Sequence, residues 1–141
     1  MTFKLIGSWI VRIVAAAILL QTLYFKFTGQ PESVELFTKL GVEPWGRIGT
    51  GVIELIASIL LLIPSTAFVG AFLGAGLMAG AIISHITVIG IESKGDGGQL
   101  FMLAVTVLVC CSITLILYKK QGFALLNKVI KKKGRVAVDL K

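Results

Sequence analysis

The sequence contains few charged residues for its length. Only 15% of its 141 residues are Asp, Glu, Lys or Arg, whereas soluble domains carry roughly a quarter. Apolar residues make up 56% of the chain, and a water-soluble protein of this size could not bury that much apolar surface. The composition therefore predicts an integral membrane protein and argues against a soluble enzyme or a disordered chain.

Residues that commonly carry metal or redox chemistry are also scarce. The chain has one histidine, His85, and two adjacent cysteines, Cys110 and Cys111, within an apolar run. One histidine without a cysteine or aspartate cluster is too little for a metal site, and adjacent cysteines rarely form a disulfide because the bond would be strained. The sequence also lacks a CxxC pair, a P-loop and an HExxH motif. We therefore expect no metal site, no disulfide scaffold and buried, structural cysteines.

Four apolar runs are each close to the length that crosses a bilayer. They cover roughly residues 5–25, 46–63, 67–91 and 99–118. A helix needs about 20 residues to cross the hydrocarbon core, and only helices or closed barrels can span lipid. Because the runs lack the alternation of barrel strands, we predict an all-α integral membrane four-helix bundle over residues 1–118.

The connections predict how these helices are joined. Only residues 64–66 separate the second and third runs, so these helices should be antiparallel neighbours, with Ser65 or Thr66 capping the third. The glycine-rich segment 92–98 predicts a turn. Between the first and second runs, a stretch begins at Pro31, repeats apolar residues at helical spacing and ends at Gly41. This pattern predicts a short amphipathic helix within residues 30–45.

The basic residues are concentrated in the tail, residues 119–141. These are Lys119, Lys120, Lys128, Lys131, Lys132, Lys133, Arg135 and Lys141. A basic end on an apolar body is typical of the cytoplasmic side of a membrane. We therefore expect both termini in the cytoplasm, segments 26–46 and 92–98 outside, and no nucleic-acid partner. The tail is predicted either to lie along the inner leaflet or to be solvated, since Phe123, Leu126 and Ile130 share one side.

Ionisable residues within the predicted spans are the first candidates for function. Glu54 lies eight residues after Gly46, about 12 Å into the membrane, and His85 should lie at about 9 Å. A carboxylate at that depth costs several kcal/mol unless it is paired, protonated or facing water. The antiparallel hairpin brings the two residues to similar depth, where a Glu–His pair could relay protons. The alternative is a structural hydrogen bond or ion pair between helices.

Three further polar residues, Lys26, Gln21 and Gln99, should lie on the same outer side. With Glu54 and His85 they predict an outer-leaflet pocket. Considered alone, Lys26 is expected to snorkel to the interface. Arg12, near the inner end of the first span, is expected to do the same, with Glu54 as its partner if it turned inward.

The third span contains two GxxxG patterns, Gly70 to Gly74 and Gly76 to Gly80. Small residues let helix backbones approach closely in lipid. The patterns therefore predict tight packing, either within the bundle or in a homodimer.

Several of these residues occur together in a pattern similar to a known family. The pattern includes Phe25-Lys26, Val34-Glu35-Leu36-Phe37, Leu40-Gly41, Pro44, Gly51-Val52-Ile53-Glu54-Leu55 and Gly80-Ala81 to His85. Over roughly residues 8–118 the chain resembles the DoxX family of small four-helix bacterial membrane proteins. The resemblance implies a multi-pass protein of the bacterial inner membrane, with Lys26, Glu54 and His85 as its functional positions. Some relatives are associated with quinone-linked sulfur oxidation, as in thiosulfate:quinone oxidoreductase, or with membrane oxidoreductase complexes.

These observations support one preferred function and two alternatives. The preferred function is a membrane subunit that binds a quinone or similar lipophilic molecule and supports a redox process with a membrane or soluble partner protein. The first alternative is a non-enzymatic accessory or scaffold subunit of a membrane complex. The second is a small-solute transporter. Under each of these functions we expect the chain to lie in a lipid bilayer. A homo-oligomer is a further alternative.

Overall fold

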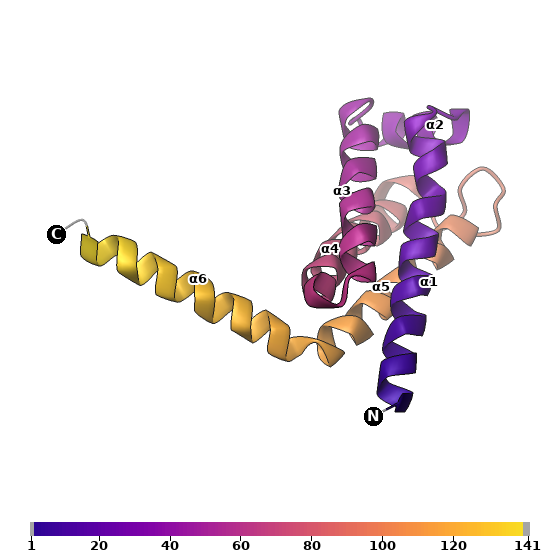
Figure 1. Ribbon diagram of the computed structural model, residues 1–141. Helices are drawn as coiled ribbons and strands as arrows, with labels where there is room; N and C mark the ends of the chain where they lie inside the picture. The colour runs from indigo at the N-terminus through magenta and orange to yellow at the C-terminus, as the bar shows by residue number, and fades with distance from the viewer. Residues whose placement is uncertain (1, 140–141) are drawn as a thin grey trace.

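The computed structural model describes residues 2–139, and every regular element in that range is helical (Figure 1). Met1, Leu140 and Lys141 lie outside the described residues, so the predicted basic tail is described from residue 119 to residue 139. The elements are α1 (Thr2–Phe27), α2 (Pro31–Lys39), α3 (Trp45–Leu62), the 3₁₀-helix η1 (Pro64–Thr66), α4 (Ala67–Ser84), the π-helix η2 (His85–Ile89), α5 (Gln99–Leu117) and α6 (Lys119–Asp139).

Four helical segments are long and apolar enough to cross a membrane. They are α1, α3, the continuous segment Pro64–Ile89 and α5. Their bounds agree closely with the predicted runs, which confirms the all-α architecture with four candidate spans. Four such segments are typical of a protein that crosses a membrane several times, so the fold indicates a multi-pass membrane protein.

The four long helices pack in a ring. α1 contacts α3 and α5, and α4 contacts the same two helices. Their shared core is made largely of small and aliphatic side chains: Ala15, Leu19, Ala57, Leu61, Ala71, Met78, Ala104, Val107, Cys110 and Cys111. Most large apolar side chains of these helices are exposed on the outside of the ring instead. That distribution suits a lipid environment, in which close backbone packing rather than apolar burial holds helices together.

Gly70 marks the closest approach of α3 and α4. A Cβ atom at Gly70 would lie 2.6 Å from the backbone nitrogen of Leu61. One turn later, a Cβ atom at Gly74 would lie 2.8 Å from the Sγ atom of Cys111 on α5. The first GxxxG pattern therefore packs inside the bundle.

The second GxxxG pattern is placed differently. A Cβ atom at Gly76 or Gly80 would meet nothing within 4 Å. Both glycines instead line an open space between the helices, so their small size keeps that space free.

Arg12 connects three helices at the end of the bundle where α1 begins and α6 starts, called here the α6 end. Its side chain is fully buried; Nε donates to the carbonyl of Leu61 at 2.6 Å and Nη1 donates to the Tyr118 hydroxyl at 3.0 Å. The guanidinium carbon lies 4.2 Å from the centre of the Trp9 ring. The prediction that Arg12 snorkels was wrong, because a helix C-terminus and aromatic faces offset its charge within the protein. Glu54 is not among its partners in the described chain.

The start of α4 is capped by a residue far along the chain. Neither Ser65 nor Thr66 caps this helix through its side chain, so that prediction was wrong. Instead the Gln121 side chain accepts the Phe68 amide proton at 2.9 Å and donates to the Pro64 carbonyl at 3.0 Å. This bridge fixes the first turn of α6 to the connection between α3 and α4.

The opposite end of the bundle, called here the α2 end, carries helix α2 (Figure 1). The helix begins at Pro31 and Gly41 follows it with φ +74°, a left-handed conformation that glycine adopts without strain. Phe37 is its buried residue. Its place on the outer surface of a membrane stays a prediction.

Replacing Gly70 by alanine is expected to destabilise the bundle. Because the new methyl group would press on the backbone of α3, we expect Gly70→Ala to lower the free energy of unfolding by about 1–3 kcal/mol. Gly76→Ala is the matched control: it has free space, and alanine's helix propensity should leave stability unchanged or raise it by up to about 1 kcal/mol. Thermal unfolding followed by circular dichroism in detergent measures both. Equal melting temperatures would contradict the assigned helix contact.

Candidate functional site

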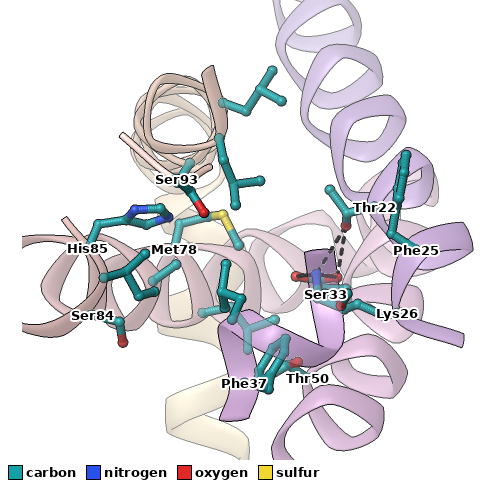
Figure 2. A pocket seen from close by; sticks show the side chains of 18 of the residues that line it. Thr22, Phe25, Lys26, Ser33, Phe37, Thr50, Met78, Ser84, His85 and Ser93 are labelled. Atoms are coloured by element: carbon teal, nitrogen blue, oxygen red, sulfur yellow. Dashed lines mark hydrogen bonds and ion pairs between the residues drawn. The ribbon is translucent and has the colours of Figure 1, made fainter. Parts of the chain in front are cut away.

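A cavity of about 860 Å³ opens between the helices toward the α2 end of the bundle (Figure 2). Its walls come from α1, α2, α3, α4, η2, the turn before α5 and α5 itself. Pockets that bind small molecules have volumes of about 300–1,000 Å³ and mostly apolar walls. All five residues predicted for the pocket line this cavity: Gln21, Lys26, Glu54, His85 and Gln99.

Lys26 and Glu54 form an ion pair on one wall of the cavity. Lys26 Nζ donates to Glu54 Oε2 at 2.7 Å and to Oε1 at 2.9 Å. The Thr22 hydroxyl, one turn earlier on α1, lies 3.0 Å from Glu54 Oε2. Glu54 is only 4% exposed, so its charge depends on this partner. The prediction that Lys26 snorkels was therefore wrong: its ammonium group turns inward to a carboxylate on α3.

Arg47, which forms a local ion pair with Glu43, also ties the same ends of α1 and α3 together through a hydrogen bond to the backbone of α1. Arg47 Nε donates to Glu43 Oε1 at 2.8 Å, and Nη1 donates to the carbonyl of Lys26. Arg47 is buried. It therefore satisfies a backbone carbonyl at the C-terminus of α1, where helix carbonyls lack partners within their own helix. Sequence analysis missed both Arg47 and Thr22. The only signal for Arg47 was its spacing of four residues from Glu43.

His85 lies on the opposite side of the cavity from Thr22 and Lys26 (Figure 2). It begins the π-helix η2, and such π-turns occur frequently at functional sites. Its Nδ1 atom is 2.8 Å from the carbonyl of Gly90, and its ring packs edge-on against Phe101 at 5.8 Å. Because a carbonyl only accepts, Nδ1 must carry the proton. Nε2 is then the nitrogen that can accept, and within residues 2–139 it has no hydrogen-bond partner.

Glu54 and His85 thus share a cavity, but in the described structure they are not hydrogen-bonded to each other. Glu54 pairs with Lys26, and His85 is oriented by Gly90. Any proton exchange between the two would need a molecule in the cavity between them. The geometry therefore favours two separate polar groups facing one ligand over a direct Glu–His pair.

Gln21 and Gln99 line the cavity at exposed positions. Neither side chain has a hydrogen-bond partner in the described structure, so both amides are free to bind a ligand or solvent. The structure places them at the edge of the cavity rather than with the buried polar groups.

The turn between η2 and α5 is organised by Asp96. Its carboxylate accepts hydrogen bonds from the amides of Ser93, Gly98 and Leu100 at 2.8–3.1 Å. Burial raises the pKa of the Asp96 carboxyl, but the three amide hydrogen bonds outweigh that effect and leave the pKa lowered. Asp96 lies two residues before Gly98, the N-cap of α5. An aspartate in the glycine-rich segment ahead of a helix was the signal that could have identified its role.

Helix α2 is tied to the same turn by charge. Glu35 of α2 forms ion pairs with Lys94 in the turn and with Lys39 one helical turn along α2. The hydrogen bond from Lys94 lowers the pKa of the Glu35 carboxyl. Since residues of α2 and of the turn both line the cavity, this contact joins two of its walls.

Residues 10–114, well over half of the chain, match the DoxX-like family. No curated protein and no solved structure matches the chain.

Removing one member of the Lys26–Glu54 pair should cost more stability than removing both charges. Lys26→Met leaves the Glu54 carboxylate buried without a cation, and we expect a loss of about 3–5 kcal/mol. In Lys26→Met/Glu54→Gln no charge is left unpaired, so most of that loss should be recovered. Chemical unfolding in detergent gives the three free energies.

The matched control for this pair is Lys39→Met. Its ion pair with Glu35 is exposed and 3.7 Å long, so the loss should stay below about 1 kcal/mol. A Lys26/Glu54 double variant that loses as much free energy of unfolding as Lys26→Met, or more, would show that the buried pair does not act as a unit.

Proposed function

The chain belongs to the DoxX-like family, and on that basis we propose that it is a membrane subunit that binds a quinone-class molecule in this cavity. Its role is to support a redox process in a bacterial inner membrane, together with a membrane or soluble partner protein that exchanges electrons with the bound ligand. The observation that carries the proposal is the placement of the Glu54 carboxylate and of His85 on opposite sides of one largely apolar cavity.

The shape and lining of the cavity support a lipophilic ligand with a polar ring. Apolar side chains from several helices line most of it, among them Ile18, Leu36, Leu77, Leu100 and Leu103. The buried polar groups are few, and they lie on two facing sides. A ligand with an apolar body and oxygen atoms on two opposite edges matches this distribution.

Hydrogen-bond chemistry favours the reduced form, the quinol. A quinol presents two hydroxyl donors, and the two groups described above are acceptors: the Glu54 carboxylate and the neutral His85 imidazole through Nε2. Lys26 and Thr22 bond to the Glu54 carboxylate and hold it in place. Gly90 holds the His85 ring in the tautomer that leaves Nε2 free.

These roles balance for oxidation of the bound quinol. Two electrons pass to the partner protein, one hydroxyl proton moves to the Glu54 carboxylate and the other to His85 Nε2, and the product is the quinone. In the reverse direction the same two residues return the protons to the quinone oxygens.

Binding of matched quinol analogues tests this proposal. A short-chain hydroquinone should bind nanodisc-embedded protein at least about 10-fold more tightly than its dimethyl ether, because the hydrogen bond to the Glu54 carboxylate alone contributes about 1.5–3 kcal/mol. His85→Leu, and Lys26→Met/Glu54→Gln, in which neither charge is left unpaired, should each remove much of that preference. Empty nanodiscs correct for partitioning into lipid.

Glu92→Gln is the control for this experiment. Glu92 is an exposed carboxylate outside the cavity lining, so the variant should bind both ligands as the original protein does. Equal affinity for the hydroquinone and its ether, or an unchanged preference in the cavity variants, would contradict the proposed site.

A further inference from the structure

Helix α6 (Lys119–Asp139) leads away from the bundle along most of its length (Figure 1). Several of its large apolar side chains are exposed, among them Phe123 at 65%, Leu126 at 56% and Ile130 at 59%. Nothing in the proposed quinol site uses this helix. The exposed apolar side chains of α6 are therefore not explained by that site.

The exposed residues of α6 are sorted onto two faces. At 100° per residue, one arc of the helix collects apolar side chains, and these are Phe123, Leu125, Leu126, Val129, Ile130 and Val136. Five of the seven basic side chains fall on the opposite arc, and these are Lys120, Lys128, Lys131, Lys132 and Arg135. Lys119 and Lys133 fall within the apolar arc, and Val138 falls within the basic arc. A helix with one apolar face and one basic face is typical of helices that lie in the interface of an anionic membrane.

The point at which α6 starts is fixed relative to the candidate spans. α5 ends at Leu117, and α6 begins after the single residue Tyr118. The Gln121 side chain then bonds to Pro64, between α3 and α4, and to Phe68 in the first turn of α4. Gly122 packs against the Phe68 ring. The first turn of α6 is thus held where two candidate spans end, which is at the surface of the bilayer.

From this placement we infer that α6 lies on the membrane surface at which α5 ends and binds anionic phospholipid headgroups. Its apolar face enters the boundary of the leaflet, and its basic face pairs with the phosphate and carboxylate groups of lipids such as phosphatidylglycerol. A second copy of α6 does not fit as the occupant, since each copy carries seven lysine or arginine residues and they would repel. The inference does not depend on the proposed quinol site.

Hydrogen exchange of the full chain in nanodiscs tests this inference. In nanodiscs containing about one third phosphatidylglycerol, amides of residues 123–138 should exchange at least about 10-fold more slowly than in pure phosphatidylcholine, because binding suppresses local opening of the helix. Amides of α5 should not change. Raising the salt concentration to about 0.5 M should reverse much of the difference, since salt screens headgroup contacts.

Charge-matched variants separate lipid binding from a general effect of net charge. Lys131→Gln/Lys132→Gln should lose most of the phosphatidylglycerol-dependent protection, whereas Lys4→Gln/Lys39→Gln, which removes the same charge from other helices, should keep it. Leu126→Ser/Ile130→Ser should also lose protection although every basic residue remains.

Two results would overturn the inference. Equal exchange of α6 in both lipids would show a solvated tail. Protection that is absent in phosphatidylglycerol nanodiscs and appears only when another protein purifies with the chain would show that α6 binds a protein.

Discussion

The Lys26–Glu54 ion pair is the interaction on which the rest of the site depends. A carboxylate placed between membrane helices is costly unless a cation and hydrogen-bond donors accompany it. Lys26 and Thr22, one turn apart on α1, provide both. The pair therefore fixes α1 against α3 and also holds the Glu54 carboxylate at the wall of the cavity. Arg47 strengthens the same junction by binding the C-terminal carbonyl of Lys26.

The two ends of the bundle use polar groups in different ways. At the α6 end, the guanidinium of Arg12 is fully enclosed by Leu61, Tyr118 and Trp9, and the helices close around it. At the α2 end, the glycines Gly76 and Gly80 leave space that no side chain of the described chain fills. The same helices thus form a packed region at one end and a cavity with facing polar walls at the other.

Much of this fold could be predicted from the sequence, because the apolar runs are long and clearly bounded. The bounds of the four candidate spans could be predicted in this way. So could the polar residues that line the cavity, which are Glu54, His85, Lys26, Gln21 and Gln99. Intramembrane ionisable residues are costly, and they stand out in a sequence with few charges.

The errors arose where a side chain finds its partner on another helix. A basic residue near a helix end, such as Lys26 or Arg12, is expected to snorkel when it is considered without its partners. Their real partners are 28 and 49 or more residues away in sequence, and sequence spacing cannot indicate such pairs. The predicted capping residue of α4 was wrong for the same reason, since the residue that caps this helix, Gln121, belongs to α6.

The most direct test of the central claim is native mass spectrometry of the protein extracted gently from its own membrane. The account predicts a chain that retains a bound molecule with the mass of an isoprenoid quinone or quinol, released as one species on activation. A chain that retains only phospholipid, or a second protein without any such molecule, would contradict a quinone-class ligand in the cavity.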